Sequence, residues 1–255
     1  MTSFVSVRNI SMNYHSKSGE TSAVDNLSFD VAKGEFVSLV GPSGCGKSTL
    51  LSVISGLSTP SSGEVLIDGQ SVSEARDCVG YMLQRDCLFE WRTVYQNATL
   101  GLELQKKLTP ENRAYVDTLF EQYGLKEFAN HMPSELSGGM RQRAALIRTL
   151  AAKPSLLLLD EPFSALDYQT RLYISDEVGH ILRQEKKTAI LVTHDIAEAI
   201  SLSDRIIVLT KRPCGIKNIH TLEFTSTGKV PKNAREAPEF RDYFNKIWKE
   251  LDVHV

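Results

Sequence analysis

The clearest chemical pattern in this chain is a glycine-rich loop, residues 41–49, with the sequence GPSGCGKST. An apolar run precedes it and helically spaced apolar residues follow it, the context in which the pattern G-x-x-x-x-G-K-[ST] holds a phosphate. Backbone N–H groups and the positive end of the following helix then surround an anion. Lys47 would supply a positive charge for the β- and γ-phosphates, and the Ser48 hydroxyl is suited to bind Mg²⁺. The loop predicts a nucleoside triphosphate site rather than a plain glycine-rich turn. The expected nucleotide contacts are Gly41, Pro42, Ser43, Gly44, Cys45, Gly46, Lys47, Ser48 and Thr49.

Two adjacent carboxylates follow a second apolar run. Asp160 and Glu161 come directly after residues 156–159, four leucines that predict a buried strand. At the mouth of such a strand, Asp160 is placed to hold Mg²⁺ directly or through water. Glu161 is placed to orient or deprotonate an attacking water. The alternative is a pair of solvated carboxylates at a strand end, without a chemical role.

Two further features carry residue types that respond to phosphate. Ser137, Gly138 and Gly139 lie in the segment LSGGMRQR, just before an apolar helical run. They predict a second helix N-terminus that binds an anion, and the alternative is a turn that only caps the helix. His194 follows another apolar strand, which would bring it to the same sheet edge as the carboxylates. An imidazole beside a γ-phosphate can sense its charge, and the alternative is a structural histidine.

The elements that must position these residues indicate an α/β fold. Continuous apolar runs predict a buried, largely parallel sheet, because helices cover both faces of such a sheet. These runs are residues 36–40, 156–159, 189–192 and 206–209. Alternating patterns at residues 4–8 and 27–31, with a third strand at 65–69, predict a small antiparallel sheet near the N-terminus. Between about residues 85 and 150 the pattern changes to a helical period, interrupted by Pro110 and Pro133, which predicts a helical insertion.

Composition narrows the class of protein. The chain has 255 residues and a formal net charge of −2, so we expect one large domain or a domain with a subdomain, and no nucleic-acid partner. Its four cysteines show no C-x-x-C spacing, so neither zinc nor a disulfide framework is predicted. We see no secretory signal pattern and no apolar run near the roughly 20 residues that span a bilayer. A cytoplasmic protein is therefore expected.

In this order and at these spacings, the phosphate loop, the SGG motif, the strand ending in Asp-Glu and the strand-end histidine resemble the nucleotide-binding subunit of an ATP-binding cassette (ABC) transporter. The resemblance covers residues 4–212 and implies ATP and Mg²⁺ as cofactors, with Lys47 among the catalytic residues. It implies that Gln84 contacts Mg²⁺ and water and joins the core to the helical subdomain. It also implies that Asp167 reaches across a dimer interface. Tyr14 would stack on adenine, and plain packing is the alternative for this residue.

Two glycine-rich helix starts cannot both hold one γ-phosphate within a single copy if one lies in the core and the other in an inserted arm. A head-to-tail homodimer solves this problem, because Lys47 and Ser48 of one copy would face the SGG motif of the other. The contacts expected from the opposite copy are Ser137, Gly138, Gly139 and Asp167. Closure and opening of the dimer around ATP would then be a ligand-driven two-state switch.

The resemblance also implies a location and further partners. The subunit would lie peripherally on the cytoplasmic side of the inner membrane, against an integral membrane permease. An extracytoplasmic solute-binding protein would be an indirect partner. A soluble ABC ATPase that acts in DNA repair or translation is the alternative function. The single cassette, the absence of a heptad arm and the slightly negative charge disfavour it.

Three segments are similar to the importers of nitrate, sulfonates, taurine and thiamine precursors: LSGGMRQR, residues 88–97 and residues 237–241. Two residues depart from the pattern of this family. Met140 stands where the signature commonly has glutamine, and activity is expected to survive this change. Glu90 stands where a proline usually precedes the tryptophan, so the local turn is expected to differ.

Residues 88–94 are apolar and are expected to lie exposed beside the helical arm. We interpret them as a docking surface for a short helix of a membrane subunit. The alternative is that Phe89 and Trp91 pack within the subdomain.

The expected organisation has three parts. Residues 1–84 and 151–212 form the ATP-binding core with the antiparallel β-subdomain, and residues 85–150 form the helical subdomain with the signature motif. Residues 213–255 form a C-terminal extension, in which residues 225–235 look like a loop. An apolar stripe then predicts an amphipathic helix that packs back on the core. The stripe consists of Phe240, Phe244, Ile247, Trp248 and Leu251.

Overall fold

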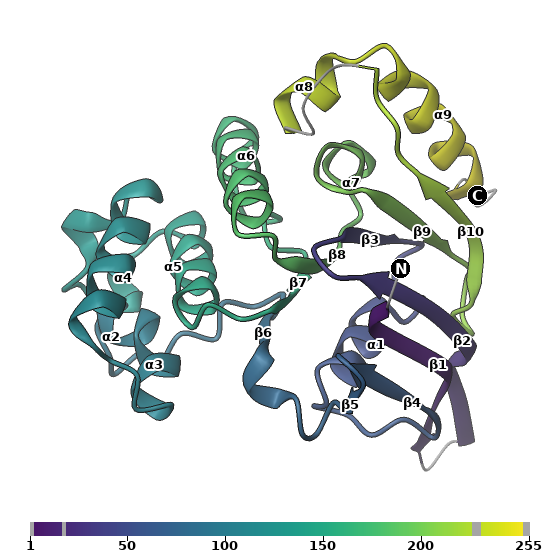
Figure 1. The fold of residues 1–255 in the computed structure, drawn as a ribbon, viewed down its shortest axis with the longest axis horizontal. Helices are drawn as coiled ribbons and strands as arrows, with labels where there is room; N and C mark the ends of the chain where they lie inside the picture. The colour runs from purple at the N-terminus through teal and green to yellow at the C-terminus, as the bar shows by residue number, and fades with distance from the viewer. Residues whose placement is uncertain (1–2, 17–18, 226–230, 252–255) are drawn as a thin grey trace.

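The computed structural model describes residues 3–16, 19–225 and 231–251. In Figure 1 the larger sheet is central, and a group of helices, a smaller sheet and the helical C-terminal end lie around it. The strands are β1 (Ser3–Ser16), β2 (Gly19–Ala32), β3 (Phe36–Val40), β4 (Ser62–Ile67), β5 (Gln70–Ser71), β6 (Val79–Met82), β7 (Leu156–Asp160), β8 (Thr188–Val192), β9 (Arg205–Leu209) and β10 (Ile216–Thr221). The helices are α1 (Lys47–Ile54), α2 (Val94–Ala98), α3 (Leu100–Leu104), α4 (Pro110–Gln122), α5 (Gly138–Ala151), α6 (Tyr168–Gln184), α7 (Ile196–Leu202), α8 (Pro231–Glu236) and α9 (Glu239–Leu251). Short 3₁₀ helices cover Arg76–Cys78, Lys126–Phe128 and Pro133–Glu135.

The larger sheet has the strand order β10-β9-β3-β8-β7-β6. Strands β9, β3, β8, β7 and β6 are parallel to their neighbours, and β10 adds an antiparallel edge. Every residue of β3, β7 and β8 is buried. This burial explains why their sequences are continuous apolar runs rather than alternating ones. The predicted parallel core sheet is confirmed.

The two faces of this sheet belong to different parts of the core. Leu156 and Leu158 of β7 pack in the cluster that contains α1 and the antiparallel sheet. Leu157 and Leu159 point to the other face, where they pack with residues of α5 and α6. The sheet therefore joins the two halves of the molecule, since alternate side chains of one strand enter different clusters.

The smaller sheet has the strand order β2-β1-β4-β5 and is antiparallel throughout. Its strands β1 and β2 are each 14 residues long, longer than the alternating patterns at residues 4–8 and 27–31 indicate. The hairpin from β4 to β5 turns at Asp68 and Gly69, which have φ values of 50° and 78°. A two-residue loop with two positive φ values matches the right-handed twist of the paired strands. The predicted antiparallel sheet is confirmed, with longer strands.

The helical insertion follows β6 and contains α2, α3, α4 and α5, which stand apart from the smaller sheet in Figure 1. Its core is continuous with that of the large sheet, because Phe120 and Leu146 share a buried cluster with Leu157. Thr93 caps α2 and Thr109 caps α4 through their side-chain oxygens, and Pro110 occupies the first turn of α4, where proline has no hydrogen bond to lose.

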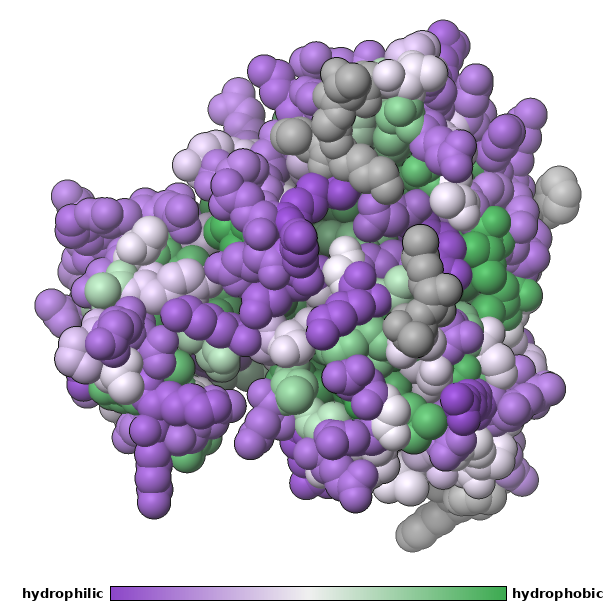
Figure 2. Space-filling view, in the orientation of Figure 1, coloured by the Kyte–Doolittle hydropathy of each residue, from purple (hydrophilic) through white to green (hydrophobic). Residues whose placement is uncertain are grey.

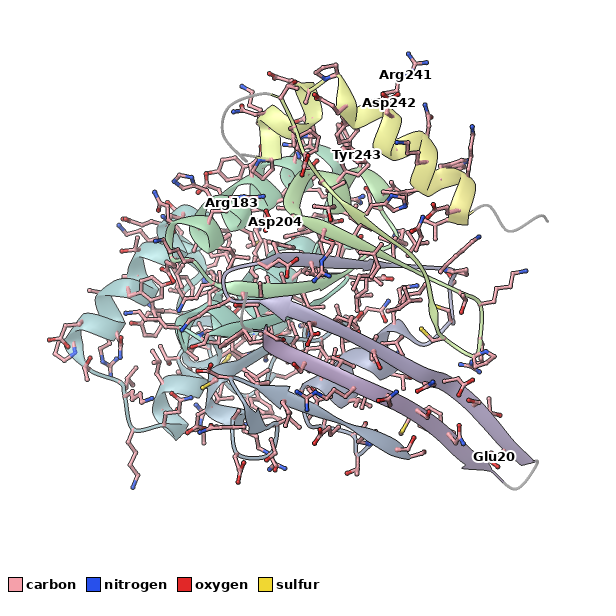
Figure 3. All side chains as sticks on the ribbon, turned by 45° about the vertical axis from the view of Figure 1, so that its right-hand side comes forward. Glu20, Arg183, Asp204, Arg241, Asp242 and Tyr243 are labelled. Carbon is pink, nitrogen blue, oxygen red and sulfur yellow. The ribbon has the colours of Figure 1, made fainter. Side chains whose placement is uncertain are left out.

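The C-terminal part forms two helices: α8 lies against α6 and α7, and α9 packs against α7 and β9 (Figure 3). Ile247 of α9 is fully buried against α7 and β9. This packing confirms the predicted amphipathic helix. Trp248 differs from the prediction, because 56% of it remains exposed while its ring stacks on Phe244. The loop predicted at residues 225–235 is wrong for its last five residues, where α8 begins at Pro231. Residues 226–230 lie outside the described part of the chain.

The outer surface shown in Figure 2 is mostly hydrophilic. Within the residues that the structure describes, no helix combines the length and the apolar character that a membrane span requires.

Candidate functional site

The phosphate loop connects β3 to α1 and depends on two glycines in left-handed backbone conformations. Gly44 has a φ of 72° and Gly46 a φ of 126°. An added Cβ at Gly46 would lie 2.8 Å from the carbonyl oxygen of Ala23, so no larger residue fits there without displacement. Lys47, which begins α1, is buried, and its Nζ donates to the carbonyl oxygens of Gly41 at 2.7 Å and Pro42 at 2.9 Å. The loop therefore holds the ammonium group inside its own curve.

The C-terminal ends of parallel strands meet at one edge of a sheet, and the other predicted catalytic residues follow these ends. Asp160 is the last residue of β7 and Glu161 comes next; Gln84 follows β6 and His194 follows β8. Nε2 of Gln84 donates to Glu161 Oε2 at 3.1 Å. Nδ1 of His194 lies 3.4 Å from Glu161 Oε1. The fold thus brings together three residues that are far apart in sequence, with the Glu161 carboxylate between the other two.

Glu161 also has an unusual backbone. Its φ is 48°, a left-handed conformation that costs energy for a residue with a Cβ and that often occurs at functional sites. Its amide donates to the carbonyl oxygen of Val192 at 2.9 Å, and its carbonyl oxygen accepts from the hydroxyl of Ser164 at 3.0 Å. These bonds hold the strained turn in place, and they aim the side chain across the strand ends.

Asp160 lies below this surface and is 3% exposed. Burial raises the pKa of its carboxyl; the hydrogen bond from Ser48 opposes this increase, and the negative charge of Glu161 adds to it. Burial and the charge of Asp160 also raise the pKa of Tyr81 to about 12. Asp160 Oδ1 has no hydrogen-bond partner among the described residues. A buried carboxylate oxygen without a partner, beside a serine hydroxyl, suits a hard divalent cation such as Mg²⁺.

These residues surround a cleft of about 490 Å³. Its lining consists of Ser43, Gly44, Gly46, Lys47, Ser48, Thr49, Gln84, Glu161, His194 and Arg212. All of these except Arg212 are predicted site residues. Arg212 follows β9, whose C-terminal end reaches the same sheet edge. The position of Arg212 just after an apolar strand could have indicated that it lies at the cleft. The sequence analysis treated this position only as the end of the ATP-binding core.

The SGG motif lies outside this cleft. Ser137 caps α5 by accepting from the amide of Met140 at 3.4 Å, and Gly138 and Gly139 form the first helical turn. Asp167 caps α6 by accepting a hydrogen bond from the amide of Thr170 at 3.0 Å. The Thr170 hydroxyl and then its amide lower the pKa of the Asp167 carboxyl by hydrogen bonding. The predicted helix start is confirmed. The structure does not place these residues around the phosphate loop of the same copy.

Tyr14 lies at the rim of the phosphate loop. Its hydroxyl is 3.3 Å from Thr49 Oγ1, and 45% of the residue is exposed. This position leaves a ring surface open beside the loop, and adenine stacking stays a prediction.

Two polar residues near the site, the buried Gln142 and the half-buried Glu198, were missed by sequence reasoning. Gln142 of α5 donates to the carbonyl oxygen of Glu161 at 3.1 Å and accepts from the amide of Ala165 at 2.9 Å. Burial and the charge of Asp195 raise the pKa of Glu198 to about 8, although a hydrogen bond from Thr193 opposes the shift. A glutamine and a glutamate on amphipathic helices look like surface residues in the sequence, so no signal distinguished them.

A strand, a glycine loop and a helix that begins with a buried lysine, next to a strand-end carboxylate pair, define a P-loop nucleoside triphosphatase. Comparison with known families makes the class specific, because residues 24–164 match the family model described as ABC transporter. The chain belongs to the ABC transporter family. It is an ATP-binding, ATP-hydrolysing subunit of a transporter.

Relatives support this assignment along the whole chain. An uncharacterized ABC transporter ATP-binding protein of Bacillus subtilis, YtlC, is 48% identical over 250 residues, which cover 98% of this chain and 96% of the relative. The aliphatic sulfonates import ATP-binding protein SsuB of Bacillus cereus is 40% identical over 249 residues, which cover 97% of this chain and 96% of the relative. The comparisons give no support to the DNA repair or translation alternative.

Solved structures agree with the fold. The dimeric structure of a bacterial ABC transporter cassette superposes with a TM-score of 0.79 at 32% identity, covering 86% of this chain and 99% of that cassette. The dimeric post-hydrolysis state of the same cassette, bound to ADP and Pi, superposes with a TM-score of 0.79 at 33% identity and the same coverage. These similarities confirm the predicted P-loop fold with its antiparallel and helical parts, and they support a dimer.

Proposed function

We propose that this chain energises a membrane importer for a small solute of the nitrate, sulfonate, taurine or thiamine-precursor type. The observation that carries the proposal is the Gln84–Glu161–His194 arrangement beside the phosphate loop, in a chain that aligns over 97% of its length with an aliphatic sulfonates import protein. The chain would lie on the cytoplasmic side of the inner membrane. Its division into a core, a helical subdomain at residues 85–150 and an extension from residue 213 is part of the proposal.

The hydrolysis step follows from the geometry of the cleft. A water molecule near Glu161 would attack the γ-phosphorus, its proton passing to the Glu161 carboxylate while the bond to the β-phosphate oxygen breaks. Lys47 would neutralise charge on the β- and γ-phosphate oxygens. Gln84 and His194 would hold the carboxylate of Glu161 in line, because each contacts one of its two oxygens.

Asp160, Ser48 and Gln84 are the residues that we propose to hold Mg²⁺. The buried, unpartnered Oδ1 of Asp160 and the adjacent Ser48 hydroxyl support this assignment. When bound, Mg²⁺ would neutralise negative charge on the phosphate oxygens.

We propose a head-to-tail homodimer with two composite ATP sites. The proposal is supported by the separation of the N-termini of α1 and α5, because the SGG motif at the start of α5 does not line the phosphate-loop cleft of its own copy. In the dimer, Ser137, Gly138 and Gly139 of one copy, with Asp167, would close the cleft of the other. The solved cassette compared above is dimeric in both of its structures.

The permease would dock on residues 88–94. The loop of residues 86–94 that carries them is called the docking loop below. Trp91 is 73% exposed, and Phe89 lies against it with a ring-centroid distance of 4.8 Å. Packing of both rings inside the subdomain, the alternative interpretation, is wrong for Trp91. Leu88 and Val94 are buried, so the loop is anchored at two points while its aromatic residues face outward. Exposed aromatic residues on a fixed loop suit a partner helix with an apolar face.

A Glu161→Gln variant tests the proposed base. Because the amide cannot accept the proton, we expect ATP binding to persist while hydrolysis falls at least tens of times, since general acid–base catalysis typically contributes roughly 10²–10⁴-fold. Phosphate release and binding of a fluorescent ATP analogue measure the two properties. Glu64→Gln, at an exposed glutamate on β4, is the matched control. Near-normal turnover of Glu161→Gln would remove Glu161 from this role.

Transport itself requires a reconstituted assay. The chain, co-expressed with membrane subunits that co-purify with it, would be placed in vesicles with the corresponding solute-binding protein. We expect ATP-dependent uptake of at least one of an aliphatic sulfonate, nitrate, taurine or a thiamine precursor. Persistent failure of any membrane subunit to co-purify would contradict the importer proposal and leave the ATPase assignment intact.

A further inference from the structure

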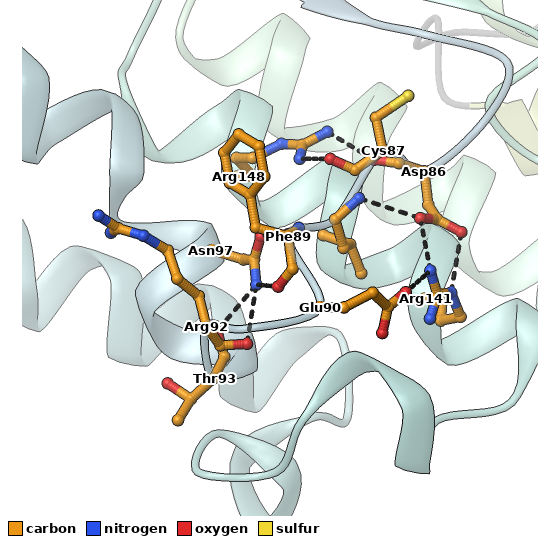
Figure 4. A network of polar contacts seen from close by, with 10 residues as sticks. Asp86, Cys87, Phe89, Glu90, Arg92, Thr93, Asn97, Arg141 and Arg148 are labelled. Carbon is orange, nitrogen blue, oxygen red and sulfur yellow. Dashed lines mark hydrogen bonds and ion pairs between the residues drawn. The ribbon is translucent and has the colours of Figure 1, made fainter.

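The N-terminal part of α5 reaches two separate loops through neighbouring side chains. Arg141 contacts the docking loop: its Nε donates to Asp86 Oδ2 at 2.9 Å, and its Nη2 donates to Asp86 Oδ1 at 3.0 Å and to Glu90 Oε1 at 2.8 Å (Figure 4). Gln142 contacts the turn after β7, through the carbonyl oxygen of Glu161 and the amide of Ala165. One helical turn therefore joins the proposed docking surface to the proposed catalytic base.

The docking loop is fixed along most of its backbone, as Figure 4 shows. The guanidinium of Arg148 donates to the carbonyl oxygens of Asp86 at 2.6 Å and Cys87 at 2.7 Å. The fully buried Asn97 accepts from the amide of Phe89 at 2.7 Å and donates to the carbonyl oxygens of Phe89 and Arg92. Because these bonds leave few free backbone groups, a push on the aromatic residues would move the loop as one body.

The Gln142 end is equally constrained. Gln142 is 5% exposed, so both ends of its side-chain amide are bonded inside the protein rather than to solvent. The Glu161 residue that it contacts has a left-handed backbone and few ways to relax. A displacement of Gln142 would therefore shift the Glu161 carboxylate relative to Gln84 and His194.

A cleft of about 410 Å³ lies at the junction of these parts. Its lining includes Gln84, Asp86, Gly138, Arg141, Gln142 and Ala165. The docking loop, the SGG motif and the turn after β7 thus share a boundary that is not filled by side chains, which leaves room for relative movement.

We propose that Arg141 and Gln142 form a relay that couples the position of the docking loop to the position of the catalytic Glu161. This inference rests on the proposed function, because it assigns the docking loop to a membrane partner. Glu90, which stands where resembling importers have proline, strengthens the relay in this chain by giving Arg141 a third acceptor oxygen. Arg141 and Gln142 are positioning residues, since neither lines the phosphate-loop cleft.

The test uses the full chain and steady-state ATP hydrolysis. Gln142→Met keeps the length of the side chain and removes both hydrogen bonds. We expect kcat to fall about fivefold, which corresponds to about 1 kcal/mol for the one lost bond that reaches Glu161. The half-saturating ATP concentration should stay within about twofold, because the phosphate loop is untouched. Glu121→Gln is the control, since it breaks the exposed Lys126–Glu121 ion pair of the same subdomain without touching α5 or the docking loop, and its kcat should not change.

A double-mutant cycle tests the coupling directly. Asp86→Asn weakens the Arg141 end, and the double variant Asp86→Asn/Gln142→Met breaks both ends. If the two contacts act as one relay, the double variant is no slower than the slower single variant. Three results would each overturn the relay. The losses of kcat in the two single variants could multiply in the double variant, or kcat of Gln142→Met could be unchanged. The third is a change in the half-saturating ATP concentration without a change in kcat. The assay contains no membrane subunit, so its outcome is separate from failure of the importer proposal.

Discussion

Replacing Gly46 with alanine tests whether the phosphate loop has the geometry that nucleotide binding requires. The φ of 126° is strained for any residue with a Cβ, which costs about 1–3 kcal/mol. The new methyl group would lie 2.8 Å from the Ala23 carbonyl oxygen and 3.2 Å from Cys214 Cβ, and such overpacking costs about 1–3 kcal/mol more. We therefore expect a total loss of about 2–6 kcal/mol in the free energy of unfolding.

Gly44→Ala is the matched control in the same loop. Its φ of 72° is also positive, but nothing lies within 4 Å of an added Cβ, so only the same backbone strain of about 1–3 kcal/mol applies. Urea unfolding of both variants isolates the overpacking cost as their difference, about 1–3 kcal/mol. Binding of a fluorescent ATP analogue, measured where both variants are folded, should be weaker for Gly46→Ala. Equal unfolding midpoints for the two variants would refute the assigned packing of Gly46 against Ala23 and Cys214.

Three further predictions follow from buried groups. Asp160→Asn should be more stable than the parent at pH 7 without Mg²⁺. Burial raises the pKa of Asp160, so the ionised carboxylate destabilises the folded state above the unfolded pKa. The Mg²⁺-dependent hydrolysis of Asp160→Asn should fall at least roughly a hundredfold. A parent that is as stable as this variant would refute the burial argument. The pKa of Glu198 is raised to about 8, so the folded state keeps a proton that the unfolded chain loses. The stability of the parent should therefore fall as pH rises from about 4.5 to 8, by at most about 1.4 kcal/mol per pH unit. Thermal unfolding of Glu198→Gln should lack this pH dependence. Ile247→Ala should cost about 2–5 kcal/mol because Ile247 is fully buried, whereas Trp248→Ala should cost clearly less in the same urea titration; equal costs would contradict the packing of α9.

The sequence predicted the parts of the fold whose physical signal is local. The apolar runs at β3, β7 and β8 are continuous because both faces of these strands are buried. The loop of Gly44 and Gly46 needs glycine for backbone reasons alone. Because adjacent parallel strands end at one edge of the sheet, the meeting of Glu161 with the residues after β6 and β8 followed from topology.

The sequence could not predict contacts that depend on packing between distant elements. Gln142 is a polar residue on an amphipathic helix, and its role depends on the turn after β7 lying beside that helix. Arg212 reaches the cleft only because β9 pairs with β3. The short helix α8 has no apolar stripe long enough to indicate it, and it lies against α6 and α7. Tertiary contacts decide such positions, and a local pattern does not contain them.

The central claim is that the cleft at Lys47 is half of an ATP site and that the SGG motif of a second copy completes it. Mixing two inactive variants tests it most directly. Lys47→Ala removes the phosphate-loop charge, and Ser137→Glu places a negative charge where the second copy would meet the γ-phosphate. A mixed dimer then contains one fully intact site and one doubly defective site. Hydrolysis in an equal mixture should rise clearly above the sum of the two variants measured alone, toward about a quarter of the parent rate if subunits exchange at random. If each copy held a complete site of its own, mixing would restore nothing, and that result would contradict the account.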